Sequence, residues 1–158
     1  PSSGTGLGSS SSFSVGLLNA MYKYNGQSPS KEHLANKACE LEIDLCKSPI
    51  GKQDQYAAAY GGIKVYRFKK DGTVGIENIN MKSETKAQLN DEIICFYIGG
   101  NRSANEILKD QNNRIHEKQK KDLMLEMVSF VDDLKEEFEN NQIINFGDIL
   151  HKNWILKK

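Results

Sequence analysis

The glycine- and serine-rich stretch at the start of the chain contains residue types that bind anions. Residues 1–21 read PSSGTGLGSSSSFSVGLLNAM. They fit either a flexible Gly/Ser linker or a phosphate-binding loop that runs into a helix. Glycines let the backbone approach an anion closely, and the N–H groups of the first helical turn point at it. The stretch passes directly into helically spaced apolar residues headed by Phe13, which favours the loop.

The glycine spacing matches neither of two familiar phosphate-binding fingerprints. Residues 4–8, GTGLG, are followed by Ser9 where the dinucleotide fingerprint requires glycine, and no lysine follows as in a P-loop. Loop chemistry therefore favours phosphate binding without identifying the nucleotide.

A second unusual cluster, KSPIGKQDQYAAAYGG, covers residues 47–62 and contains Asp54 between two glutamines. Such an aspartate is often a helix N-cap or an ordinary loop carboxylate. Alternatively, a carboxylate at the start of a helix, followed by small alanines that leave space, is placed to meet a substrate hydroxyl. The residues alone leave both interpretations open.

Apolar periodicity predicts the elements that must position these groups. A first helix runs from about Ser9 to Tyr24, with Asn25-Gly26 as its C-terminal signal. A second has Ser28 as N-cap and Pro29 at its first position, and runs to about Leu45. Their apolar stripes are, respectively, Phe13, Leu17, Met21 and Tyr24, and Leu34, Ala38, Leu41 and Leu45.

The remaining segments predict a mixed helix and strand pattern. A short helix is expected over 54–60, a β-hairpin over 63–79 with Asp71-Gly72 at its tip, and a buried strand over EIICFYI, 92–98. From Ser103 onward the sequence predicts helices. Their apolar positions are Ile107 and Leu108, then Leu123, Met127, Phe130, Leu134 and Phe138, then the stretch 146–156.

Composition limits the function classes. The chain has 158 residues, the size of one ordinary domain, with 21 basic and 21 acidic residues. Balanced charge argues against a nucleic-acid or membrane-surface partner. No segment predicts a membrane span or signal peptide, so we expect a cytoplasmic protein. Cys39, Cys46 and Cys95 lack metal-ligand or redox spacing and are expected to be buried thiols.

The opening loop resembles the central motif of the GHMP kinases, a superfamily that includes galactokinase and mevalonate kinase. The family pattern is a proline, three residues, then Gly-Leu-Gly-Ser-Ser, and residues 6–10 match it with one extra residue after Pro1. The resemblance implies that Ser10 joins a magnesium shell, with Ser9 or Ser11 as alternatives. The loop residues that it implies wrap the phosphates of ATP are Gly4, Gly6, Leu7, Gly8, Ser9, Ser10 and Ser11.

The second cluster resembles the Gly-x-x-Asp-Gln pattern of galactokinase-like members, with Gly51 as the glycine and Asp54-Gln55 as the Asp-Gln pair. The resemblance makes Asp54 the general base, or the group that orients the attacking hydroxyl. A glutamate about a dozen positions earlier coordinates magnesium in those enzymes, which implies Glu42 here. Glu40 faces another side of the helix, and without the resemblance both glutamates are ordinary exposed residues.

Within the superfamily, GKQDQYAAAYGG and the later FYIGGNRSANEILKDQ, residues 96–111, are similar to D-glycero-D-manno-heptose 7-phosphate kinases and the related fucokinases. This implies transfer of a phosphoryl group from ATP to the anomeric hydroxyl of the heptose phosphate. Lys52, Gln55 and Arg102 are the substrate-side candidates. Lys52 and Arg102 suit a substrate phosphate but equally fit solvated surface charges.

The expected fold is therefore α+β and GHMP kinase-like. Residues 1–98 correspond to the central part of the ATP-binding domain and 99–158 to the start of a helical C-terminal domain. The family's first and third motifs have no counterpart here, so we expect a middle portion of a kinase with little turnover by itself. A homo-oligomer is left open. Alternatives are a fucokinase or galactokinase-like enzyme, a non-catalytic nucleotide- or sugar-binding homologue, and an α+β domain that holds an anion without catalysis.

Overall fold

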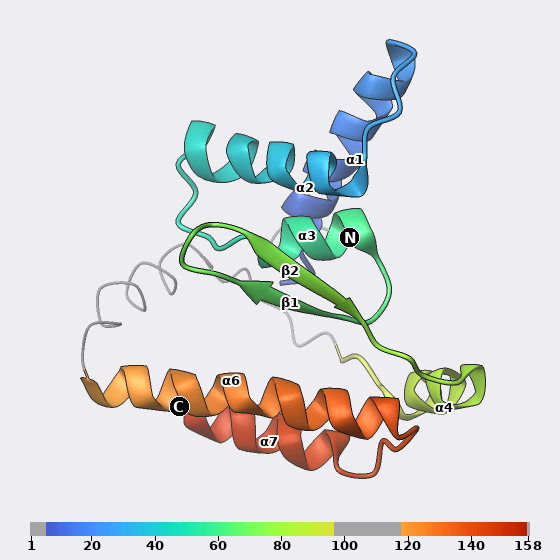
Figure 1. Cartoon of the computed structure of the whole chain (residues 1–158), viewed down its shortest axis with the longest axis vertical. Coiled ribbons are helices and arrows are strands. Elements are labelled where there is room, and N and C mark those ends of the chain that lie inside the picture. Colours follow the sequence, from blue (N-terminus) through green and yellow to red (C-terminus); the bar gives the residue numbers. More distant parts are fainter. Residues whose placement is uncertain (1–5, 97–117, 158) are drawn as a thin grey trace. The chain divides into compact units, whose positions relative to one another are not determined.

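The computed structural model describes residues 6–96 and 118–157, which fold as helices with one two-stranded antiparallel sheet (Figure 1). This confirms the α+β class. The described residues form two compact units, residues 6–62 and residues 63–96 with 118–157. The expected domain boundary after residue 98 lies outside the described residues and stays a prediction.

The first unit contains α1 (Ser9–Tyr24), α2 (Lys31–Cys39), the π-helical segment η1 (Glu40–Leu45) and α3 (Gln53–Tyr60). The three α-helices pack against one another. Ala38 has no exposed surface, and its small side chain permits a close approach between helices. The apolar core consists of Val15, Leu34 and Ala38, with Leu18, Tyr22, Ala58 and Ala59 partly buried against it.

Helix α1 has the bounds that the sequence predicts, and it ends at the expected glycine. Gly26 has φ +72°. Its N–H donates to Lys23 O at 3.0 Å, and the N–H of Gln27 donates to Tyr22 O at 2.9 Å. These two bonds form the Schellman motif, in which a left-handed residue satisfies the last carbonyls of the helix.

The apolar stripe that predicts α1 is not the face that packs within the first unit. Phe13 is 68 % exposed and Met21 55 % exposed. The buried residues of the helix are Ser11, Ser14 and Val15. The inward face combines the polar contacts of Ser11 and Ser14 to Glu42 with a second set of apolar residues, Val15, Leu18 and Tyr22.

The second predicted helix corresponds to α2 followed by η1, but its N-cap is Ser30 and not Ser28. The Ser30 hydroxyl accepts a hydrogen bond from the N–H of His33 at 3.1 Å, which satisfies one of the free N–H groups of the first helical turn. Pro29 therefore lies before the helix and not at its first position. At the other end, the N–H of Cys46 donates to Leu41 O at 2.9 Å, a π-type bond. This wider turn breaks the α-helical spacing, so Leu45 is 68 % exposed and does not join the expected apolar face.

The second unit begins with the predicted hairpin. Strands β1 (Lys64–Phe68) and β2 (Val74–Asn78) pair antiparallel, from Lys64 opposite Asn78 to Phe68 opposite Val74. Gly72 has φ +84° in the turn. Asp71 Oδ1 accepts hydrogen bonds from the N–H of Thr73 at 2.9 Å and its hydroxyl at 2.7 Å, so the expected Asp-Gly tip is confirmed.

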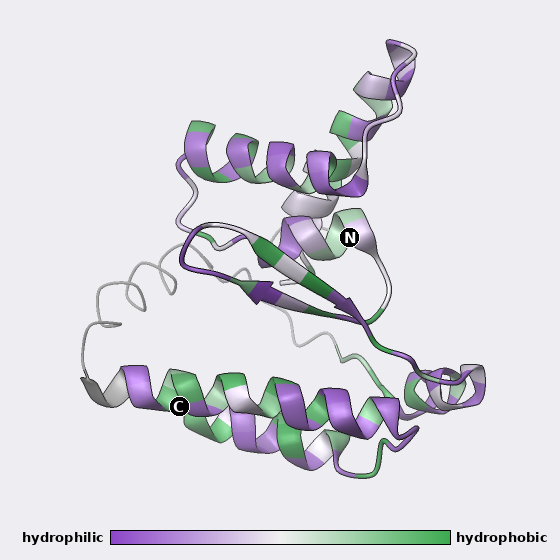
Figure 2. Cartoon of the chain, in the orientation of Figure 1, coloured by the Kyte–Doolittle hydropathy of each residue, from purple (hydrophilic) through white to green (hydrophobic). Residues whose placement is uncertain are grey.

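Three helices complete the described part of the second unit. The sequence predicts α6 (Lys118–Glu139) and α7 (Phe146–Leu156) but not α4 (Ser83–Glu92). Figure 2 shows α6 with both hydrophobic and hydrophilic residues along its length. The signal for α4 is Met81, Thr85 and Leu89, which are spaced by four and all buried. Met81 and Leu89 form a core with Phe138 and Ile143.

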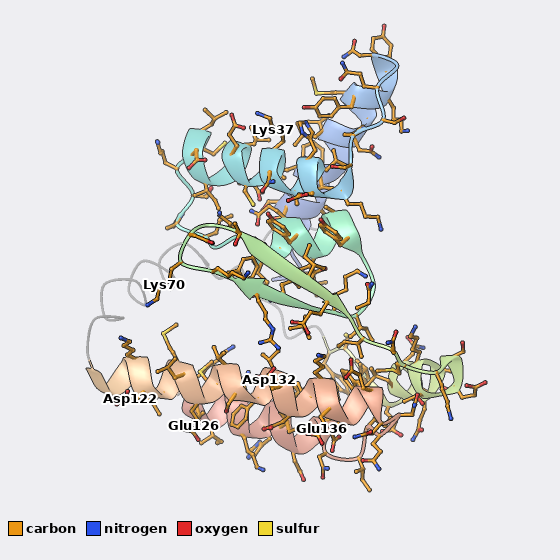
Figure 3. All side chains as sticks on the ribbon, viewed as in Figure 1. Lys37, Lys70, Asp122, Glu126, Asp132 and Glu136 are labelled. Atoms are coloured by element: carbon orange, nitrogen blue, oxygen red, sulfur yellow. The ribbon has the colours of Figure 1, made fainter. Side chains whose placement is uncertain are left out.

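Ion pairs link the hairpin to α6 within this unit. Arg67 Nη2 lies 2.6 Å from Asp132 Oδ1, and Arg67 Nε lies 2.5 Å from Glu77 Oε1. Lys135 Nζ lies 2.9 Å from Glu77 Oε2. Hydrogen bonds from Lys135 and Arg67 lower the pKa of Glu77 to about 2. Asp132 is labelled on α6 in Figure 3.

The predicted buried strand is wrong for its described residues. Glu92 ends α4, and residues 93–96 pair with no strand; Ile94 is 72 % and Phe96 81 % exposed. A strand forms only where another edge accepts its backbone bonds, and the described residues provide none here. Residues 97–98 lie outside the described part, as do the predicted helical positions Ile107 and Leu108.

The cysteines differ in environment. Cys39 is buried as expected, and burial raises the pKa of its thiol to about 11. Cys46 and Cys95 are exposed, so the expectation of buried thiols is wrong for these two. Cys46 follows the π-type turn, and Cys95 lies in the unpaired segment. No described helix is both long and apolar enough to cross a bilayer.

Two glycines of the first unit make a matched test of the α1 terminus. Gly26→Ala places a Cβ at φ +72° and should lower the free energy of unfolding by about 1–2 kcal/mol. Gly16→Ala lies inside α1, where an added Cβ meets nothing within 4 Å, and should raise that free energy by about 0.5–1 kcal/mol. Urea unfolding followed by circular dichroism measures both, and equal effects of the same sign would contradict this account.

Candidate functional site

The first turn of α1 presents backbone donors without a capping side chain. The N-cap residue Gly8 has φ +64°, no side-chain cap bond is formed, and the first turn contains no acidic residue. The first intrahelical bond runs from the N–H of Ser12 to Gly8 O at 2.9 Å. The N–H groups of residues 9–11 therefore precede the helical ladder. The positive end of the helix dipole and these donors favour an anion at this point.

Close behind this turn lies the buried carboxylate of Glu42. The residue is 7 % exposed. Its Oε2 accepts hydrogen bonds from Ser11 Oγ at 2.7 Å and from Gln55 Nε2. Its Oε1 accepts a longer bond from Ser14 Oγ at 3.3 Å. One carboxylate thus connects α1, η1 and α3.

The local sequence explains why these side chains meet. Ser11 and Ser14 are three residues apart and so share one face of α1. Glu42 lies on the face of the α2–η1 helix that carries the buried Ala38 and Cys39. Gln55 is in the first turn of α3 and has no exposed surface. Hydroxyl and amide donors satisfy a charge that would be costly to bury alone.

Asp54 lies beside the N-terminus of α1. It is exposed and belongs to the first turn of α3. A Cβ added at Gly8 would lie 3.4 Å from Asp54 Oδ2. The N-cap of α3 is Lys52, and no side-chain cap bond is formed there. Asp54 is therefore a carboxylate in the first helical turn beside the glycine loop, not the N-cap of its helix.

The structure separates the three serines that the sequence offers as magnesium ligands. Ser10 is exposed, whereas Ser11 is buried and bonded to Glu42. Ser9 Oγ is buried and has no hydrogen-bond partner among the described residues. Glu40, the glutamate not chosen, is exposed and pairs with Lys37 at 2.5 Å, on the helix marked by Lys37 in Figure 3.

The other predicted loop and substrate residues have varied surroundings. Gly6 and Leu7 are exposed, with Leu7 at 70 %. Lys52 is exposed. Gln55, a substrate candidate, is fully buried and bonded to Glu42. Gly4 and Arg102 lie outside the described residues.

The donor set suits magnesium. The Ser11 hydroxyl and the Glu42 carboxylate provide hard oxygen atoms next to each other. The described residues contain no group of three or more His, Cys, Asp or Glu side chains that could hold an ion by themselves. Magnesium is typically bound by one or two protein oxygens with waters and substrate phosphates completing its shell. The residues present therefore fit magnesium bound together with a nucleotide.

Sequence reasoning missed the donors of Glu42. The sequence patterns predict no role for Ser14, and they predict Gln55 on the substrate side. The spacing of Ser11 and Ser14 places both hydroxyls on one helical face, which is a signal for a polar contact. The sequence contains no comparable signal for Gln55, because its neighbour Glu42 is thirteen residues away.

Comparisons with known proteins give two matches. Residues 2–62 match the family model described as the GHMP kinases N terminal domain. The chain is also 25 % identical over 156 residues to the D-glycero-alpha-D-manno-heptose 7-phosphate kinase of Campylobacter jejuni subsp. jejuni serotype O:2. That alignment covers 99 % of this chain and 46 % of the relative, so the chain spans about half of the relative's length.

Residues 2–62 are therefore similar to the N-terminal domain of the GHMP kinases, and the whole chain is similar to part of one heptose phosphate kinase.

Adjacent serines test the hydrogen-bond cluster. Ser11→Ala removes a donor to the buried Glu42 and should lower the free energy of unfolding by about 1.5–3 kcal/mol, as expected for a hydrogen bond to a charged group. Ser10→Ala changes an exposed neighbour on the same helical turn and should stay within about 0.5 kcal/mol of the unmodified chain. Urea unfolding measures both values, and similar losses for the two serines would refute the assignment.

Proposed function

We propose that the full-length protein is an ATP- and magnesium-dependent sugar kinase that phosphorylates the anomeric hydroxyl of D-glycero-D-manno-heptose 7-phosphate. The observation that carries this proposal is the convergence of two carboxylates on the first turn of α1. Glu42 is bonded to Ser11 of that turn, and Asp54 approaches its N-cap glycine, Gly8.

The proposed roles follow the needs of phosphoryl transfer, which depends mainly on positioning and charge neutralisation. The N–H groups at the start of α1 bind phosphate oxygens, which fit an uncapped helix N-terminus. Glu42 and a serine hydroxyl, Ser10 or Ser11, hold magnesium, which neutralises phosphate charge when bound. Asp54 orients the acceptor hydroxyl and takes its proton. The exposure of Asp54 leaves its carboxylate accessible to a substrate.

The substrate proposal rests on the named relative, which covers nearly all of this chain. Lys52 and Arg102 are proposed partners of the substrate phosphate. A fucokinase or galactokinase-like enzyme is the second candidate, because the same carboxylates and loop suit any sugar hydroxyl. A non-catalytic homologue is less well supported, because a pure binding protein has no need of a carboxylate placed like Asp54.

The proposal extends to the organisation of the protein. Residues 1–98 form the central part of the ATP-binding domain, and 99–158 begin a helical C-terminal domain. The enzyme acts in the cytoplasm without nucleic-acid or membrane partners. We expect turnover in the full-length protein and little in this chain alone.

Asp54→Asn tests the proposed chemistry. The amide keeps the size of the side chain but cannot accept a proton as a base, so kcat should fall by about 10²- to 10⁴-fold. Asp133→Asn, an exposed aspartate of α6 in the second unit, is the control and should leave turnover unchanged. Release of ADP from the full-length protein is measured with ATP and heptose 7-phosphate.

The same assay tests the substrate. Unchanged turnover in Asp54→Asn would remove this residue from the chemistry. If the unmodified protein phosphorylated free fucose or galactose and not heptose 7-phosphate, the second candidate would replace the first. Absence of turnover with all of these sugars would contradict the proposed function.

Ser10→Ala and Ser11→Ala identify the serine that binds magnesium. Family position implies Ser10, and we expect its loss to raise the magnesium concentration for half-maximal rate by about tenfold or more, comparable with the effect of disturbing a metal site. Ser11→Ala serves as the comparison. A larger shift for Ser11 would transfer the role to that residue, and no shift for either would exclude both as ligands.

A further inference from the structure

Gln55 is a buried amide that the proposed chemistry does not yet use. It has no exposed surface. Its Nε2 donates to Glu42 Oε2, and its Oε1 has no hydrogen-bond partner among the described residues. A buried acceptor without a partner is unfavourable, and an apolar side chain of the same volume would avoid that cost. The amide N–H donor therefore needs a reason beyond packing.

The orientation of the amide follows from chemistry. An ionised carboxylate only accepts hydrogen bonds, so the atom of Gln55 that faces Glu42 must be the NH₂ group and the carbonyl oxygen must point elsewhere. Gln53, two residues earlier on the same helix, is exposed. Of these two glutamines, Gln55 is the buried one, and its amide donates to Glu42.

The hydrogen bonds divide the two oxygens of Glu42 unequally. Oε2 accepts from both Ser11 and Gln55, which uses both of its lone-pair sites. Among the residues that the structure describes, the one donor to Oε1 is Ser14, whose bond is longer, at 3.3 Å. Oε1 is therefore the oxygen with remaining capacity for a cation, and the two donors on Oε2 fix the rotation of the carboxylate.

We infer that Gln55 is a positioning residue that holds Glu42 with Oε1 available to the magnesium ion. The inference rests on the proposed function. Because Gln55 adjoins Asp54 in the first turn of α3, one helical turn sets both carboxylates relative to the start of α1. Gln55 thereby couples the cation site to the group proposed to meet the acceptor hydroxyl.

Gln55→Met in the full-length protein tests this role, with Gln53→Met as the matched control. Methionine fills a similar volume but donates no hydrogen bond. Magnesium is titrated at a fixed ADP concentration, and the melting temperature is measured at each step. The readout is the magnesium concentration at which half of the total rise in melting temperature is reached. Binding of Mn²⁺ in the presence of ADP, followed by electron paramagnetic resonance, is the second readout. Loss of an outer-shell partner typically weakens metal binding by about 10- to 100-fold. We expect a shift of that size for Gln55→Met and less than about twofold for Gln53→Met.

A swap of the two side chains separates positioning from packing. Gln55→Glu alone places a second carboxylate next to Glu42. Repulsion between the two should lower the melting temperature of the protein without ligand. Adding Glu42→Gln restores an amide–carboxylate pair and should recover that temperature. The carboxylate then lies on α3, so the magnesium requirement should stay raised. Recovery of a normal magnesium requirement in the swapped variant would overturn the inference.

The outcomes distinguish this inference from the function on which it rests. If ADP and magnesium do not stabilise the unmodified protein, the proposed function fails. If they do, and Gln55→Met lowers only the melting temperature while its magnesium requirement equals that of Gln53→Met, the positioning role alone is wrong. If Gln55→Met does not fold, Gln55→Asn is measured in its place, because it shortens the side chain and withdraws the amide from Glu42. A magnesium requirement of Gln55→Asn equal to that of Gln53→Met would then overturn the positioning role.

Discussion

The burial of one carboxylate organises the first unit of this protein. Removing Glu42 from water is unfavourable unless hydrogen bonds replace its hydration. The required donors come from Ser11, Ser14 and Gln55, on two helices that are separate in sequence from η1. Together with the apolar packing of Val15, Leu18 and Tyr22, this need favours the face of α1 that turns inward. It explains why two serines are buried while Phe13 is exposed, against the simple expectation for an amphipathic helix.

The features that could be predicted from the sequence are those with local causes. Gly26 ends α1 because of the conformation of that residue, and the Asp71-Gly72 tip forms through contacts among neighbours. The bounds of α7 follow from apolar residues that recur from Phe146 to Leu156. The errors concern features that depend on distant partners. Residues 93–96 are apolar enough for a strand, but the described residues give them no neighbouring edge.

For the candidate site, residue types were predictable and their pairing was not. The resemblance to a kinase family selected Glu42, Asp54 and the loop serines by their position in the sequence. It could not show that the hydroxyl facing Glu42 belongs to Ser11, because that depends on how α1 is rotated about its axis. The role of Gln55 was equally hidden, since the rotation of α3 brings its amide to Glu42 and directs its neighbour Asp54 toward Gly8.

The irregular backbone of the first unit is concentrated around the same glutamate. Glu42 lies within a π-helical segment, a rare conformation that occurs frequently at functional sites. Beyond it, Lys47 adopts φ +55°, an uncommon conformation for a residue other than glycine. The chain then turns back so that the N–H of Ser48 donates to the carbonyl oxygen of Glu42 at 3.0 Å. Glu42 is therefore held through its backbone as well as its side chain. A regular α-helix would be the more favourable backbone here, so its replacement by a π-turn and a left-handed residue is best explained by the need to hold this carboxylate in one orientation.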